Sequence, residues 1–215
     1  MADYRAVATT CEAVVHLLRT AHRPPELDTP LEFKVYTSRD FTQSSIASGV
    51  SLFLYRIFAN GVHRTPPGGI GPDGRRLRSR LPVDLHFLLT VWGKEASLQH
   101  AIAGWMMRLL EDHPVLPSGL LDTVAPEVFG AEETVEISLT ELTNEDLLRI
   151  WEVLGLNAYQ LSVPYVARVI EIESDQSRPD SWGEPVQERR VDATVITGPP
   201  GLPGDQHPGG PGGGP

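Results

Sequence analysis

A single change of hydrophobic period, within LPVDLHFLLTVWGKEASLQHAIAGWMMRLLEDHPVL, constrains the fold of this chain more than any other feature. From Leu81 to Val91 every second residue is apolar, which is the period of a β-strand whose two faces differ. Gly93 ends the alternation, and apolar residues then recur at helical spacing from Leu98 until Pro114 stops the helix. The segment therefore predicts a strand, a turn and a long amphipathic helix.

The same signals place the other elements. A first helix is predicted from Asp3, which can cap it, to just before Pro24, and a short helix begins after Thr143, which forms a near capping box with Asp146. Pro164 lacks a ladder donor, so we expect its strand to lie at an edge or to carry a bulge. The predicted fold is α/β, more narrowly α+β, with a mostly antiparallel mixed sheet of about five strands, two long helices and one short helix. The predicted strands are Leu31–Val35, Gly49–Ala59, Leu81–Trp92, Thr134–Leu139 and Tyr159–Glu173.

The end of the chain differs in composition from the rest. Nearly every residue from Gly198 to Pro215 is Gly or Pro, and such a segment cannot bury enough apolar surface to offset the entropy lost on ordering. A collagen-like register begins there, but His207 breaks it. We therefore expect a folded domain over residues 1–174, an extension over 175–197 and a disordered tail over 198–215.

Cysteine usage and hydropathy indicate the compartment. The single cysteine, Cys11, has no partner for an internal disulfide, which suits a reducing environment. Charged residues interrupt the apolar residues of the N-terminus, which is not typical of a signal peptide. No stretch approaches the roughly 18 apolar residues that a membrane-spanning helix needs. The sequence thus predicts a soluble, cytoplasmic protein with no membrane partner.

The charge of the chain is uneven. A net charge of −10 argues against general nucleic-acid binding, which depends on cations that face phosphates. A basic segment nevertheless precedes Leu81, whereas Asp122 to Glu152 is rich in acidic residues. Such a chain can pair with its own copies or with a charged ring, although the basic segment is also compatible with a solvated loop. Its candidate interface residues are Arg64, Arg75, Arg76, Arg78 and Arg80.

Asp84 and His86 form a candidate acid–base pair, because residues two apart on a strand point to the same face. No nucleophile with a partnering base can be placed near them, so a polar or interface face is the favoured interpretation. The histidines lack the spacing of a metal site, and the glycine-rich PPGGIGPDG leads into a strand, unlike a phosphate-binding loop. The sequence therefore predicts no catalytic residue, no metal, no cofactor and no enzymatic activity.

Five segments in series resemble the cap, or tail-terminator, proteins of phage-tail-like contractile injection systems. They are GVSLFLYRIFANGVHR, LPVDLHFLLTVWG, the helix that ends in HPVL, LTNEDLLRIWEVL and YQLSVPYVARVIEIES. The resemblance implies a tail-terminator-like fold and a six-fold ring that closes the distal end of the inner tube and sheath and halts their growth. It implies three partners within an assembled particle: the tube protein, the sheath protein and further copies of this chain.

The stretch from Val186 to Ile196 is too polar for a core strand, yet it is β-prone. Given the resemblance, we expect it to add as a strand to the edge of an adjacent sheath subunit. Main-chain hydrogen bonds would supply the affinity of this contact, so polar side chains are tolerated on its outer face. The candidate residues are Val186, Gln187, Arg189, Val191 and Val195.

Two other functions stay open on the sequence alone. A monomeric adaptor would bind one acidic partner through the Arg-rich loop. A small hydrolase would use Asp84 and His86 and would have a substrate pocket around the strand Leu81–Trp92. The mass in solution separates the adaptor from a ring, and an activity assay of an Asp84→Ala variant tests the hydrolase.

Overall fold

The alternating and the helical apolar patterns of the sequence both correspond to regular secondary structure. The computed structural model describes residues 2–23, 27, 29–43, 46–63, 80–154 and 159–173, all within the unit Met1–Gly183. The helices are α1 (Ala6–Ala21), α2 (Asp40–Gln43), α3 (Ala96–Asp112), α4 (Ser118–Val124) and α5 (Asn144–Val153). The strands are β1 (Glu32–Tyr36), β2 (Gly49–Ala59), β3 (Arg80–Trp92), β4 (Val115–Leu116), β5 (Val135–Leu139) and β6 (Ser162–Glu173).

The described strands form one mixed sheet in the order β1-β2-β3-β6-β5-β4. Only the β1–β2 pair is parallel, and the other pairs of this sheet are antiparallel. The predicted α+β class and its mostly antiparallel sheet are therefore confirmed, with six strands in place of about five. The additional strand, β4, has 2 residues, and the additional helices α2 and α4 have 4 and 7. Elements this short carry too few residues to display a period.

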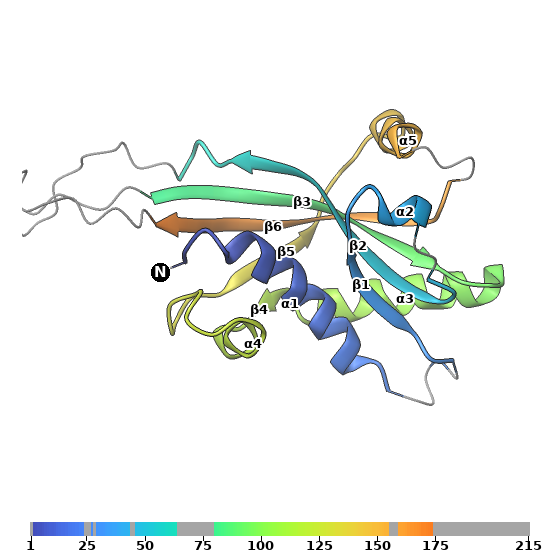
Figure 1. The fold of residues 1–215 in the computed structure, drawn as a ribbon, viewed down its shortest axis with the longest axis horizontal. Coiled ribbons are helices and arrows are strands. Elements are labelled where there is room, and N and C mark those ends of the chain that lie inside the picture. Colours follow the sequence, from blue (N-terminus) through green and yellow to red (C-terminus); the bar gives the residue numbers. More distant parts are fainter. Residues whose placement is uncertain are drawn as a thin grey trace, which may run out of the picture. The chain divides into compact units, whose positions relative to one another are not determined.

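Helices cover both faces of the sheet, as Figure 1 shows. The larger core joins α1, α3 and α4 to the inward side chains of the strands, among them Leu85, Phe87 and Leu89 of β3. A smaller aromatic core on the opposite face joins Phe41 of α2 to Trp151 of α5. This second core explains why β3 is buried on both faces toward Trp92, although its sequence alternates.

The two predicted helix starts differ in outcome. At α5, Thr143 Oγ1 accepts a hydrogen bond from the Asp146 N–H at 3.1 Å, which confirms the predicted cap. At α1, the regular helix begins one residue after Arg5, which has helical dihedral angles and makes no side-chain cap. The Asp3 carboxylate accepts the Arg5 N–H at 2.7 Å, the hydrogen bond of an N-cap, so Asp3 caps the turn that leads into the helix.

β6 is an inner strand and not an edge strand, but Pro164 lies where β6 has no β5 residue to pair with, and β6 does carry a register shift further along, between Ala167 and Ile170. β6 lies between β3 and β5, and Pro164 pairs in regular register with Leu88. The Pro164 carbonyl accepts a hydrogen bond from the Thr140 N–H at 3.2 Å, one residue past the end of β5. Because N and C=O of one strand residue point to the same side, the missing donor falls where β5 has already ended.

The three longest strands run past their neighbours. β2, β3 and β6 have 11, 13 and 12 residues, whereas β1 and β5 have 5 each. Ala59 pairs with Val83, and Arg80 pairs with Glu173, so all three strands reach the same end of the sheet. We call this the open end, and the end at Trp92 the helix-covered end.

Candidate interface surfaces

Most of the predicted basic interface cannot be placed. Arg80 begins β3, and its guanidinium lies 3.1 Å from the carboxylate of Glu171 on β6. This partly exposed pair adds little stability, but it engages the Arg80 charge within the chain. The interface role of the cluster stays a prediction, and four of its five arginines lie outside the described residues: Arg64, Arg75, Arg76 and Arg78.

The predicted sheath-binding strand also lies outside the described residues, and its role stays a prediction. It comprises Val186, Gln187, Arg189, Val191 and Val195.

Asp84 stabilises the backbone at the open end through its hydrogen bonds. Its Oδ1 accepts a hydrogen bond from the Val169 N–H at 2.9 Å, and Asn60 Nδ2 donates to Oδ2 at 3.0 Å. The β3–β6 register shifts beside Asp84, and Val169 has a φ of 52°, which a β-branched residue rarely adopts. The carboxylate therefore holds an irregular stretch of β6 and the end of β2.

His86 shares a face of β3 with Asp84, as the spacing predicts, but no acid–base pair results. The imidazole lies 6.2 Å from the Tyr55 ring, centroid to centroid. Burial lowers the pKa of His86 most, the Arg56 charge lowers it further, and Asp84 only partly opposes this shift. The surroundings of the ring thus disfavour its protonated form, and the Asp84 carboxylate hydrogen-bonds to Asn60 and to the Val169 N–H instead of to the imidazole.

Two exposed arginines flank His86 on this face. Arg56 pairs in register with His86, and Arg168 also lowers the pKa of His86, after burial and Arg56. We call Arg56, His86 and Arg168 the basic row. The Arg56 guanidinium lies 4.9 Å from the ring centroid of Phe58, a cation–π contact. Neither arginine forms an ion pair with a carboxylate of the described residues.

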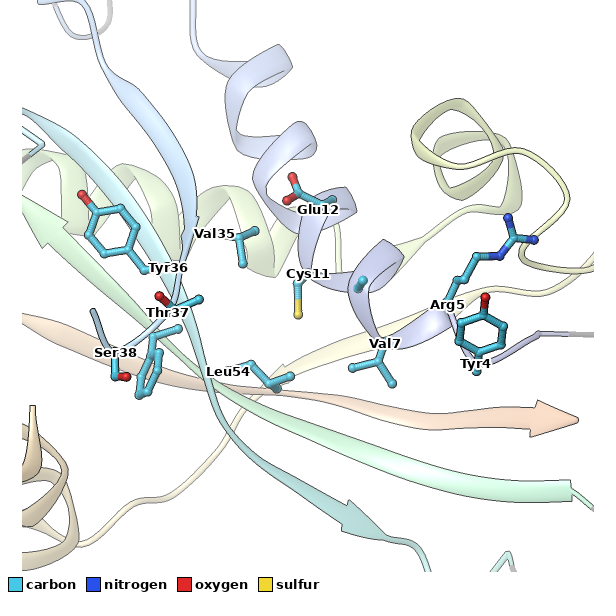
Figure 2. A pocket seen from close by; sticks show the side chains of 12 residues that line it. Tyr4, Arg5, Val7, Cys11, Glu12, Val35, Tyr36, Thr37, Ser38 and Leu54 are labelled. Atoms are coloured by element: carbon cyan, nitrogen blue, oxygen red, sulfur yellow. The ribbon is translucent and has the colours of Figure 1, made fainter. Parts of the chain in front are cut away.

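An apolar groove of about 600 Å³ lies on the opposite face, between α1 and the strands β1 and β2. Figure 2 shows Val7 and Cys11 of α1 and Leu54 of β2 pointing into it. Burial raises the pKa of Cys11 to about 12, so its thiol stays protonated and acts as an apolar wall. The full lining is Tyr4, Arg5, Val7, Ala8, Cys11, Glu12, Val35, Tyr36, Thr37, Ser38, Phe53 and Leu54.

Sequence reasoning missed the groove and the basic row. The one available signal was the difference in length between the strands predicted at Leu31–Val35 and Gly49–Ala59, which implies that one of them runs on alone. In the part of the chain that the structure describes, no helix is long and apolar enough to cross a bilayer. The same residues contain no group of three or more His, Cys, Asp and Glu side chains arranged for a metal ion.

Residues 9–188 match the family model described as the Pvc16 N-terminal domain. The solved anti-feeding prophage cap, a tube-terminating cap, has a similar fold, with a TM-score of 0.54, 18% sequence identity and coverage of 79% of this chain and 56% of that chain. The sheath/tube terminator of PVC, an extracellular contractile injection system, in its extended state gives a TM-score of 0.49, 17% identity and coverage of 79% and 57%. This chain therefore spans just over half the length of both. No curated protein sequence matches it.

The family match covers most of the chain, from α1 past the last described strand, β6. The six-stranded α+β fold agrees with it, since it is similar to that of a solved tube-terminating cap. The chain belongs to the Pvc16 N-terminal domain family.

Proposed function

We propose that this chain closes the end of a contractile injection particle by forming a ring, with six copies expected, on the inner tube and sheath. The observation that carries the proposal is the family match over residues 9–188. The similarity in fold to the anti-feeding prophage cap supports it. The proposed partners are the tube protein, the sheath protein and further copies of this chain.

The proposed mechanism is physical, and no bond needs to be broken. A subunit that offers one face to the last tube layer and no equivalent face to a further layer stops growth. Charge supports this arrangement. The two arginines of the basic row are exposed, while Glu145 and Asp146 of α5 belong to an acidic stretch that a neighbour could present.

Ring formation is tested by the mass of the purified protein in solution. Light scattering, on the chain alone and with tube protein, should detect a species of about six copies in at least one condition. A strict monomer under both conditions would contradict the ring and favour the adaptor.

The basic segment is tested by charge reversal. Arg75, Arg76 and Arg78 are replaced together by Glu, because exposed ion pairs contribute only about 0–1 kcal/mol each. Arg80 is left intact because it pairs with Glu171. We expect particles without a cap and of irregular length by electron microscopy. The control is Arg108→Glu, an exposed arginine of α3, and normal particles with the triple variant would show that the segment is only a linker.

A further inference from the structure

The position beside the second half of β2 is vacant among the described residues. β1 pairs with β2 only from Gly49 to Phe53, and β2 continues to Ala59. On its other side β2 stays paired with β3 over its whole length, apart from one register shift at Leu54. β2 therefore changes from an inner strand to an edge strand halfway along.

The main-chain groups at this edge point outward. The Asn60 N–H donates to the Pro82 carbonyl of β3 at 2.9 Å, so Asn60 faces β3. Because strand residues alternate in direction, the N–H and C=O groups of Ile57 and Ala59 face away from β3. No described strand receives them. Such a row of unpaired groups is a template for another strand.

On the face of the sheet that α1 covers, the groove lies next to this vacant position. Val7, Ala8 and Cys11 of α1 line it beside Leu54, where β1 has ended (Figure 2). Ile57 lies further along β2, pairs with the inward-facing Leu85 and is 51% exposed. A strand added to β2 would point every second side chain toward this apolar wall.

On the opposite face of the same edge, Arg56 presents an exposed positive charge, while the Asp84 carboxylate of this face is held by hydrogen bonds from Asn60 and the Val169 N–H. Arg56 is exposed, contacts Phe58 and lacks a described carboxylate partner, and Phe58 is itself 48% exposed. A bound strand would point its other side chains toward Arg56. Charge complementarity therefore favours an acidic strand.

We propose that the β2 edge from Leu54 to Ala59, together with the α1 groove, accepts one extended segment of a partner protein. The segment carries small apolar side chains toward α1 and acidic side chains toward Arg56. Binding is by strand addition, in which main-chain hydrogen bonds give affinity and the groove selects side chains. The site lies on a single subunit, so it does not depend on ring formation or on the proposed capping role.

A labelled synthetic peptide tests the site on the full-length chain. The probe is fluorescein-SVEADVTAES, which alternates small apolar and acidic or hydroxyl side chains, and its control is SVKAKVTAKS. Fluorescence polarisation should give saturable binding of the acidic peptide and at least about tenfold weaker binding of the basic one. Absence of saturable binding, or equal affinity for both peptides, overturns the proposal.

Substitutions locate the bound peptide. Ala8→Trp fills the groove and should weaken binding at least about tenfold. Its matched control is Ala101→Trp, an exposed alanine of α3 outside the groove, which should leave binding unchanged. Ala59→Pro removes one outward donor and should weaken binding about fivefold, as the loss of one hydrogen bond predicts. Peptide affinity that is insensitive to both Ala8→Trp and Ala59→Pro places the peptide elsewhere and overturns the proposal.

A charge swap tests the role of Arg56. Arg56→Glu should reverse the preference, so that SVKAKVTAKS binds more tightly than SVEADVTAES, whereas Arg108→Glu should not. Amide hydrogen exchange of the free protein gives an independent check, because Ile57 and Ala59 should exchange much faster than Phe58, which faces β3. Equal protection of the three amides would mean that the edge is already covered, and this too would overturn the proposal.

Discussion

The two ends of β3 differ in what surrounds them. At the helix-covered end, Leu88, Leu89 and Thr90 are buried, because helices pack on both faces of the sheet. At the open end, Leu81 is 44% exposed and His86 is half-buried. One strand thus lies within the core at one end and is partly exposed at the other, where the proposed contacts lie.

The largest expected effect concerns this difference in burial between the two ends of β3. Leu89→Ala removes a side chain that is 0% exposed and should lower the free energy of unfolding by about 3 kcal/mol, since it leaves a cavity in the larger core. Leu81→Ala, on the same strand, should cost less than about 1 kcal/mol. Urea unfolding of both variants measures the difference. Equal losses would mean that the open end is covered as well as the helix-covered end.

The sequence predicts the long elements because each displays its period over several repeats. The alternation from Leu81 to Val91 and the helical spacing after Leu98 correspond to β3 and α3 within two residues. Thr143 similarly locates the start of α5, because a cap is a local hydrogen bond that needs no tertiary partner.

Tertiary neighbours account for what the sequence does not predict. Pro164 indicates only that a donor is missing, and not that β5 ends beside it. The Asp84–His86 spacing places two side chains on one face, but the hydrogen bond from Val169 arises 85 residues away. The groove depends on α1 lying over a position that β1 leaves vacant, which no local pattern encodes.

A smaller effect is expected at the irregular stretch of β6 that the Asp84 carboxylate holds. Asp84→Ala should lower the free energy of unfolding by about 2 kcal/mol, because the Val169 N–H loses a charged acceptor. Asp84→Asn keeps an acceptor oxygen and should cost about half as much. Chemical denaturation compares the two. If Asp84→Ala were as stable as the unsubstituted chain, the carboxylate would not support the irregular register of β6.

The smallest expected effect is electrostatic and concerns the basic row. The folded-state pKa of His86 lies below its ordinary value of 6.5, chiefly because of burial and then because of Arg56. The unfolded chain therefore binds a proton at His86 more readily than the folded chain does. The stability that the folded chain gains by keeping His86 neutral is therefore fully present above pH 6.5, and it is lost as the pH falls from 6.5 through the folded-state pKa.

NMR titration of the His86 imidazole measures that pKa without denaturing the protein. Arg56→Gln removes the nearby positive charge and should raise the pKa toward 6.5, whereas Arg149→Gln on α5, an arginine already paired with Glu145, should leave it unchanged. An acidic strand bound at the β2 edge would screen Arg56 and should shift the pKa in the same upward direction. A His86 pKa that changes with neither Arg56→Gln nor the bound peptide would mean that the Arg56 charge does not act on the imidazole, and that the peptide does not bind beside Arg56.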